Sequence, residues 1–114
     1  MVTVYGIKNC DSVKKALAFF KTHGIAYELI DFKSTHADCA TIKRWLEQTD
    51  LKTLMNSRGT TYRTLGLKAM DLDDAAKIEW LAKENMLIKR PVVEYGGTIL
   101  VGFDQSRYEG VFLP

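Results

Sequence analysis

The strand–helix–strand pattern at the start of the chain constrains its fold more than any other feature. Residues 2–5 form a β-branched and aromatic run, which is typical of a strand. Asp11 and Ser12 can cap a helix that continues to Gly24, and residues 27–32 have the pattern of a second strand. A unit of this length is most simply a right-handed crossover between two parallel strands.

The other end of the chain has the pattern of an antiparallel hairpin. Residues 92–95 and 98–101 are strand-like, and only Gly96 and Gly97 separate them. A two-residue Gly-Gly link is a strong hairpin signal. A short last helix is expected over residues 104–108.

The spacing of apolar residues between these two parts is mainly helical. One helix is expected from Thr35 onward, with Cys39 on its apolar face, and others over 51–55 and 71–85. A polar, irregular segment is expected over 56–62. The order of elements predicts an α/β protein with a thioredoxin-like fold, built from a four-stranded mixed sheet with a helical insertion.

Length and composition agree with one globular domain. A chain of 114 residues allows a single domain, which we expect over residues 1–114 with the helical insertion at about 35–87. Apolar residues make up 46% of the chain and charged residues 26%, and this balance excludes disordered and collagen-like classes.

Charge and cysteine usage exclude several classes of partner and compartment. A net charge of +2 is too weak to imply a nucleic-acid or membrane surface. No apolar run approaches the roughly 20 residues of a membrane span, and the first residues lack the pattern of a signal peptide. Cys10 and Cys39 are too few for a disulfide framework, and His23 and His36 lack metal-ligand spacing. We therefore expect a cytoplasmic protein without a metal site.

Cys10 is the most specific candidate for a chemical role. It lies between the first predicted strand and the first helix, where the orphan amides and the dipole of a helix start favour thiolate over thiol. Lys8 adds positive potential, and polar neighbours such as Asn9 favour an exposed cysteine over a buried one. The thiolate is the nucleophile in disulfide exchange.

The predicted site contains a single thiol. Val13 occupies the position at which thioredoxins and dithiol glutaredoxins carry a second cysteine. A disulfide at Cys10 therefore needs an outside thiol such as glutathione, or Cys39. The apolar surroundings expected for Cys39 favour a core position over a resolving role.

Two arginines are candidates for binding an anion near Cys10. Arg90 and Pro91 directly precede the hairpin, and a proline at this point of a thioredoxin-like fold is typically cis and beside the cysteine. The guanidinium fork of Arg90 would suit an oxyanion or a carboxylate there. Arg58 lies next to a glycine in the polar segment and is the second candidate.

Several segments resemble the ArsC/Spx superfamily, and most closely its YffB subgroup of bacterial proteins. These segments are Tyr-Gly-Ile-Lys-Asn-Cys-Asp-Ser-Val-Lys-Lys-Ala at 5–16, Asn-Ser-Arg-Gly-Thr at 56–60, Leu-Ile-Lys-Arg-Pro-Val-Val at 87–93, Val-Gly-Phe-Asp at 101–104, and the terminal Phe-Leu-Pro. Together they span nearly the whole chain. The resemblance implies a thioredoxin-like fold with a helical insertion and a monothiol cysteine after the first strand.

The resemblance to the arsenate reductases of this superfamily implies a set of site residues. Those enzymes use a cysteine and three arginines, with glutathione and glutaredoxin as reductants. Cys10 matches the cysteine and Arg90 one arginine, whereas Arg58 is displaced by about two residues from another. The third would fall within residues 101–103, which contain no cation. Each charge-assisted hydrogen bond is typically worth ~1.5–3 kcal/mol, so this chain should hold arsenate less well.

Two function classes remain open from the sequence. The first is a glutathione-dependent thiol reductase in which Cys10 attacks and the other site residues bind substrate or glutathione. Those binding residues are Lys8, Asn9, Arg58, Arg90 and Pro91. The second is a regulator that binds the RNA polymerase α subunit, as Spx proteins do, although Val13 breaks their Cys-x-x-Cys switch.

The reductase interpretation implies particular partners. No tightly bound cofactor is expected, and glutathione is the expected co-substrate. The thiol donor would be glutathione or a glutaredoxin-type protein, and neither a membrane nor a nucleic acid is expected as a direct partner.

Overall fold

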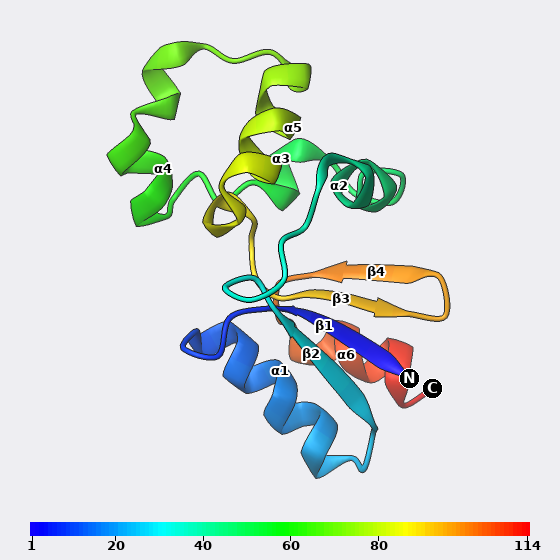
Figure 1. Cartoon of the computed structure of the whole chain (residues 1–114). Coiled ribbons are helices and arrows are strands. Elements are labelled where there is room, and N and C mark those ends of the chain that lie inside the picture. The colour runs from blue at the N-terminus through cyan, green and yellow to red at the C-terminus, as the bar shows by residue number, and fades with distance from the viewer. The chain divides into compact units, whose positions relative to one another are not determined.

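The computed structural model describes every residue, 1–114, and contains a four-stranded mixed sheet with six α-helices (Figure 1). The strands are β1 (Val2–Gly6), β2 (Tyr27–Asp31), β3 (Val92–Tyr95) and β4 (Thr98–Val101). Their order in the sheet is β2-β1-β3-β4, with β1 parallel to β2 and β3 antiparallel to both of its neighbours. This is the α/β, thioredoxin-like arrangement that the order of elements predicts. No helix has the length and apolar character that a membrane span requires.

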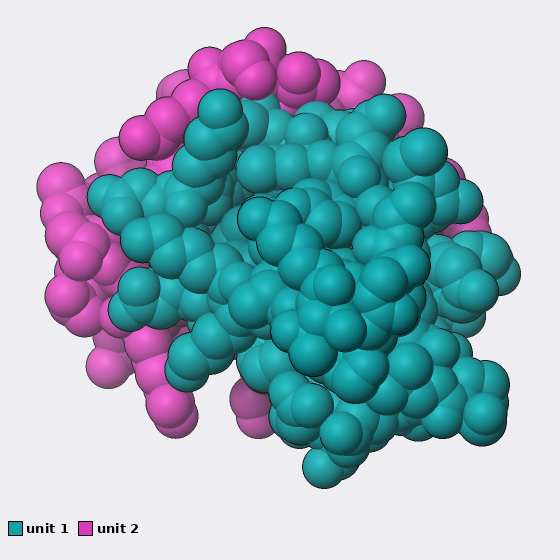
Figure 2. All heavy atoms as spheres, turned by 90° about the horizontal axis from the view of Figure 1, so that it is seen from below, with its two compact units in different colours: residues 1–31, 90–114 teal, residues 32–89 magenta.

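The chain forms two compact units (Figure 2). The sheet unit consists of residues 1–31 and 90–114, and the helical unit consists of residues 32–89. The sheet unit contains α1 (Asp11–Thr22) and α6 (Gln105–Phe112). The helical unit contains α2 (Cys39–Trp45), α3 (Leu51–Leu54), α4 (Thr60–Leu65), α5 (Asp74–Lys83) and the 3-10 turns η1 (Leu67–Met70) and η2 (Asn85–Leu87). The single domain over 1–114 stays a prediction.

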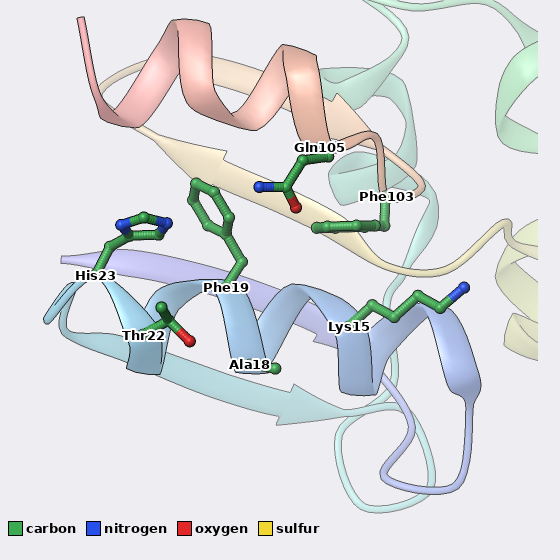
Figure 3. Close-up of a pocket in the computed structure, with 7 residues that line it drawn as sticks. All are labelled: Lys15, Ala18, Phe19, Thr22, His23, Phe103 and Gln105. Carbon is green, nitrogen blue, oxygen red and sulfur yellow. The ribbon is translucent and has the colours of Figure 1, made fainter.

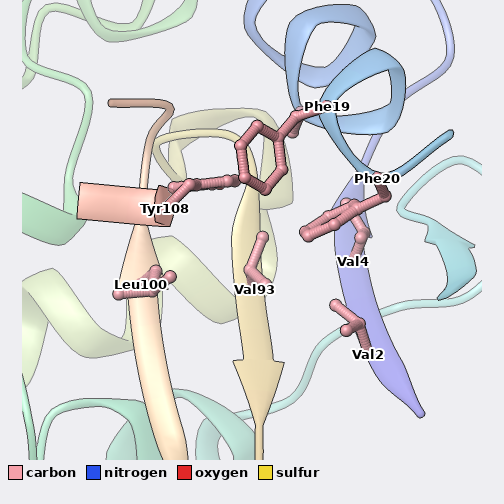
Figure 4. Packing of buried hydrophobic residues seen from close by; sticks show 8 residues of the cluster. Val2, Val4, Phe19, Phe20, Val93, Leu100 and Tyr108 are labelled. Atoms are coloured by element: carbon pink, nitrogen blue, oxygen red, sulfur yellow. The ribbon is translucent and has the colours of Figure 1, made fainter. Parts of the chain in front are cut away.

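The core of the sheet unit lies between one face of the sheet and helices α1 and α6 (Figure 4). Alternate residues of a strand point to the same face, so Val2 and Val4 of β1 both enter this core. Phe20 of α1 stacks on Tyr108 of α6 with their ring centroids 5.8 Å apart. The cluster of buried side chains is Val2, Val4, Ala16, Phe19, Phe20, Val93, Leu100 and Tyr108. This packing fixes α1, and therefore the residues at its start, against β1.

The predicted hairpin is confirmed. Gly96 and Gly97 link β3 to β4 with φ angles of 53° and 84°, the left-handed region that glycine enters without a steric penalty. The last helix begins where expected but continues to Phe112. The core stabilises this extension, since the ring centroids of Phe112 and Phe20 lie 5.0 Å apart.

Several boundaries in the helical unit differ from those expected. The helix expected from Thr35 onward begins at Cys39, after the Asp38 cap. The segment expected to be irregular contains the start of α4, which begins after an extended Gly59 and ends at a left-handed Gly66. The helix expected over 71–85 begins only at Asp74, because Asp71 is left-handed with a φ of 48°. Asp73 caps that helix by accepting the Ala76 N–H at 2.8 Å.

Two other aspartates cap short helices, and both have a lowered pKa. Asp38 accepts the Thr41 N–H at 2.9 Å, and Asp50 accepts the Thr53 N–H at 2.7 Å. Hydrogen bonds from Thr41, the backbone amide first, lower the pKa of Asp38 below its ordinary 3.8. Those from Thr53, the side chain first, do the same for Asp50. These caps therefore stabilise the folded state more strongly when the carboxyls are ionised than when they are protonated.

A double variant, Asp38→Asn with Asp50→Asn, should isolate this pH dependence, because asparagine keeps the capping acceptor but does not titrate. A carboxyl with a lowered folded pKa stabilises the protein above its unfolded pKa and loses that contribution as pH falls through the folded value. The free-energy difference between wild type and variant should be constant from about pH 7 to 5 and shrink below about pH 4. Urea denaturation across this range measures it. An unchanged difference at low pH would contradict the argument.

Candidate active site

Cys10 is the N-cap residue of α1. Its backbone is extended, with φ −140° and ψ 126°, and no side chain caps the helix. The prediction that Asp11 and Ser12 cap this helix is wrong, because the Cys10 carbonyl already accepts the Lys14 N–H at 2.9 Å. The helix therefore begins directly after the cysteine. The half-buried Cys10 thiol is left at a helix start whose first amides no capping side chain occupies.

The turn between β1 and α1 presents polar side chains beside the cysteine. Ile7 is buried, whereas Lys8 and Asn9 are exposed. Both predicted residues therefore lie in the same short connection as Cys10 and face solvent. An ammonium group there adds to the positive end of the helix dipole.

Val13 occupies the position of a second cysteine in dithiol proteins, and here it is a packing position. The Val13 side chain is fully buried. It lies so close to β1 that a Cβ atom on Gly6 would come within 2.7 Å of Val13 Cγ2. Gly6 thus allows the first turn of α1 to approach the end of β1. The site has no neighbouring thiol in the helix.

Arg90 and Pro91 lie at the same end of the sheet as the turn that carries Cys10, the end at which β1 stops and β3 starts. Tyr5 pairs with Val92 across antiparallel strands, so the residues after β1 and those before β3 leave the sheet together. The Arg90–Pro91 peptide bond is cis, as its position before the hairpin favours. Pro91 is buried and Arg90 is half-buried.

Two hydrogen bonds that the sequence did not indicate hold the proline segment in place. The Gly102 N–H donates to the Pro91 carbonyl at 2.8 Å, and the Tyr108 hydroxyl donates to the Gly102 carbonyl at 2.8 Å. Burial raises the pKa of Tyr108, so the hydroxyl keeps its proton and remains a donor. The sequence offered only a tyrosine shortly after the Val-Gly-Phe-Asp segment, and its burial is a finding of the structure.

Two other candidate residues, Arg58 and Cys39, belong to the helical unit. Arg58 is exposed in a loop of the helical unit, where its carbonyl accepts a hydrogen bond from Arg63 Nη1 at 2.9 Å. Cys39 is the first residue of α2 in the same unit and is half-buried, not fully in the core as expected. Both cysteines are free thiols. The sheet unit therefore supplies Lys8, Asn9, Cys10, Arg90 and Pro91 to the candidate site.

A separate groove of about 290 Å³ lies between α1 and the start of α6 (Figure 3). Phe19 and Phe103 form its aromatic wall, and the His23 ring lies 4.6 Å from that of Phe19. Cys10 does not line this groove. The His23 ring therefore packs against Phe19. No group of three or more His, Cys, Asp or Glu side chains in the structure could hold a metal ion.

Comparison with known proteins identifies the family. The ArsC family model matches residues 5–111. The chain belongs to the ArsC family. An uncharacterized protein of Haemophilus influenzae is 38% identical to this ArsC-family chain, over 98% of the chain and 99% of the relative.

Solved structures of related proteins share the fold of this ArsC-family protein. The YffB (PA3664) protein is 39% identical, with a TM-score of 0.90 over 96% of this chain and 97% of that one. An ArsC-related protein from Brucella melitensis is also 39% identical, with a TM-score of 0.76 over 97% and 93%.

More distant members of the family have names that point to two kinds of activity. A Neisseria meningitidis relative named arsenate reductase is 26% identical over 96% of this chain and 97% of its own. A Listeria innocua relative named global transcriptional regulator Spx is 28% identical over 100% of this chain and 88% of its own.

Proposed function

We propose that this ArsC-family protein is a glutathione-dependent thiol reductase with Cys10 as its single nucleophile. In the first step the Cys10 thiolate attacks the glutathione sulfur of a mixed disulfide, RS–SG. The S–S bond breaks, RS⁻ leaves and takes a proton from water, and Cys10 becomes Cys10–S–SG. A second glutathione thiolate then attacks this disulfide, releasing GSSG and restoring the Cys10 thiolate. The net reaction consumes RS–SG and GSH and yields RSH and GSSG.

The observation that carries the proposal is the position of Cys10 at the uncapped start of α1. Amides that no side chain occupies, together with the helix dipole, stabilise an anion there. That anion is the thiolate before attack and the leaving thiolate in the second step. Val13 supplies no second thiol, so the resolving thiol must come from another molecule.

The remaining site residues would orient glutathione or another anion. Arg90 is held beside the cis-proline, and its guanidinium suits a glutathione carboxylate or a substrate oxyanion. Lys8 and Asn9 are exposed donors in the turn between β1 and α1. Pro91 would pack beside the bound glutathione. An adduct of Cys10 with an oxyanion such as arsenate is the second reaction open to this site.

Oxyanion binding should be weak, because the segment that would supply a third arginine contains none. Val101 and Phe103 are half-buried apolar side chains, and Gly102 between them is buried. The Neisseria relative is named arsenate reductase. This chain has the cysteine and one of the three arginines that the resemblance to arsenate reductases implies. We therefore place mixed disulfides ahead of arsenate as substrates.

Mapping the glutathione adduct tests the proposal. After incubation with oxidised glutathione, proteolysis and mass spectrometry should find the adduct on the Cys10 peptide and not on the Cys39 peptide. Excess reduced glutathione should remove it. Arg90→Ala should slow adduct formation about tenfold, the value of one charge-assisted contact. Arg107→Ala, an exposed arginine of the same unit, is the matched control. An adduct only on Cys39, or none, would refute the site.

A second candidate function is a regulator that binds the RNA polymerase α subunit without redox catalysis. The relatives named Spx favour it. Affinity capture of the polymerase α subunit by this protein, retained after Cys10→Ser and independent of reductant, would support it. Adduct formation at Cys10 together with failure to capture that subunit would decide for the reductase.

A further inference from the structure

We propose that a cationic pocket on the helical unit binds a small molecule carrying at least two neighbouring oxyanion groups, phosphate or carboxylate. The pocket has a volume of about 310 Å³. Its lining consists of Lys52, Thr53, Met55, Asn56, Ser57, Arg58 and Lys89. All of these residues belong to the helical unit, so the inference does not depend on the reductase function of Cys10.

The charge of the lining selects an anion. Lys52, Arg58 and Lys89 come from three different segments, and no acidic side chain lines the pocket with them. Like charges gathered in this way repel one another, and a bound anion removes that repulsion. Three cations favour a ligand with more than one negative charge, and the guanidinium fork of Arg58 suits the paired oxygens of a phosphate or carboxylate.

Neutral hydrogen-bond donors complete the lining. Ser57 carries a hydroxyl group and Asn56 carries an amide, whereas the Thr53 hydroxyl already donates to the Asp50 carboxylate. The nearby Asp50 carboxylate is already engaged, since it accepts the Thr53 N–H at 2.7 Å as the cap of α3. Ser57 and Asn56 can therefore donate hydrogen bonds to an anionic occupant beside the three cations.

The backbone around the pocket is fixed before any ligand binds. Met55 and Ile88 form an antiparallel bridge, the Asn56 N–H donates to the Leu87 carbonyl at 2.8 Å, and the Lys89 N–H donates to the Leu54 carbonyl at 2.7 Å. These bonds join the segment of Asn56 to that of Lys89. A lining held by its own hydrogen bonds loses less conformational entropy when it binds a ligand.

Gly59 determines how closely the loop approaches the Asn56 side chain of the pocket. A Cβ atom on Gly59 would come within 2.7 Å of Asn56 Nδ2, so glycine allows the Asn56 side chain to lie against the turn. The Arg63 guanidinium donates to the Arg58 carbonyl at 2.9 Å and holds the loop from its other side. The arginine that the sequence singled out thus stands on a fixed loop.

A neighbouring cavity of about 320 Å³ gives the ligand room for an organic body. It shares Lys52, Met55 and Ser57 with the first pocket. Its further lining residues are Leu51, Tyr62 and Lys77. Oxyanion groups in the cationic pocket with an apolar part beside Tyr62 would use both spaces.

Titration of the ¹⁵N-labelled full chain with pyrophosphate, and separately with citrate, at constant ionic strength tests the proposal. Amide shifts of residues 52–58 and 87–89 should saturate, and the more tightly bound probe identifies the preferred oxyanion. The double variant Lys52→Gln with Lys89→Gln should weaken that binding about tenfold or more. Lys14→Gln with Lys21→Gln in α1 removes the same charge and should change it less than about twofold. Shifts that do not saturate, or equal weakening in both double variants, would overturn the proposal.

Discussion

Replacing Cys10 with serine should reduce turnover of a glutathionylated substrate to the uncatalysed background. A serine hydroxyl is not ionised at neutral pH and does not take part in disulfide exchange. Serine is at the same time a favourable N-cap residue, so the start of α1 should be retained or slightly stabilised. Loss of activity in this variant would therefore not reflect unfolding. A glutathione-reductase-coupled assay with a glutathionylated peptide measures the turnover, and circular dichroism checks the fold.

Cys39→Ser is the matched control for that experiment. It removes the other thiol, which lies in the helical unit, and should leave turnover within about twofold of wild type because the proposed cycle uses one protein thiol. Full activity in Cys10→Ser, or loss of activity in Cys39→Ser, would show that the nucleophile has been assigned to the wrong cysteine.

Asn85→Asp should strongly destabilise the helical unit. Asn85 is 5% exposed, and its side chain satisfies both polar groups of Ala37: Oδ1 accepts the Ala37 N–H at 2.8 Å, and Nδ2 donates to the Ala37 carbonyl at 3.0 Å. Nδ2 also donates to the Leu81 carbonyl at 2.9 Å. An ionised aspartate of the same shape would set an oxygen against these carbonyl oxygens. Burying an uncompensated charge costs roughly 3–5 kcal/mol.

Urea denaturation at neutral and acidic pH measures this loss and its cause. Acid protonates the new carboxyl and restores one donor, so the deficit of Asn85→Asp relative to wild type should shrink as pH falls. Asn9→Asp makes the same chemical change at an exposed position and should alter the free energy of unfolding by less than about 0.5 kcal/mol. Equal effects of the two substitutions would show that the Asn85 hydrogen bonds carry no special weight.

The sheet unit was largely predictable because its elements have local signals. The β-branched run at 2–5 and the glycine pair at 96–97 each specify backbone geometry through their own residues, and both predictions are confirmed. The cysteine at the strand–helix junction was equally visible. Its place as the cap itself was not, because Asp11 and Ser12 are better capping residues than cysteine.

The parts that escaped prediction depend on contacts distant in the sequence. Asn85 is polar in a helical stretch, and nothing near it indicates that it bonds Ala37, which lies 48 residues away. The link from Tyr108 through Gly102 to Pro91 likewise joins a helix, a strand end and a turn. The sequence predicted that Arg58 binds an anion. Only the structure shows that Lys52 and Lys89 line the same pocket as Arg58.

The sheet unit is built from two separate segments of the chain, and this arrangement has a consequence for biosynthesis. The chain leaves the sheet after β2 and returns at β3, and these strands lie on either side of β1, about 10 Å apart. On the ribosome, β1, α1 and β2 therefore emerge first but cannot close their core until Val93, Leu100 and Tyr108 follow. The helical unit, continuous in sequence, can fold in the interval. Once folded, it shortens the flexible loop that β3 must close, which lowers the entropic cost of completing the sheet.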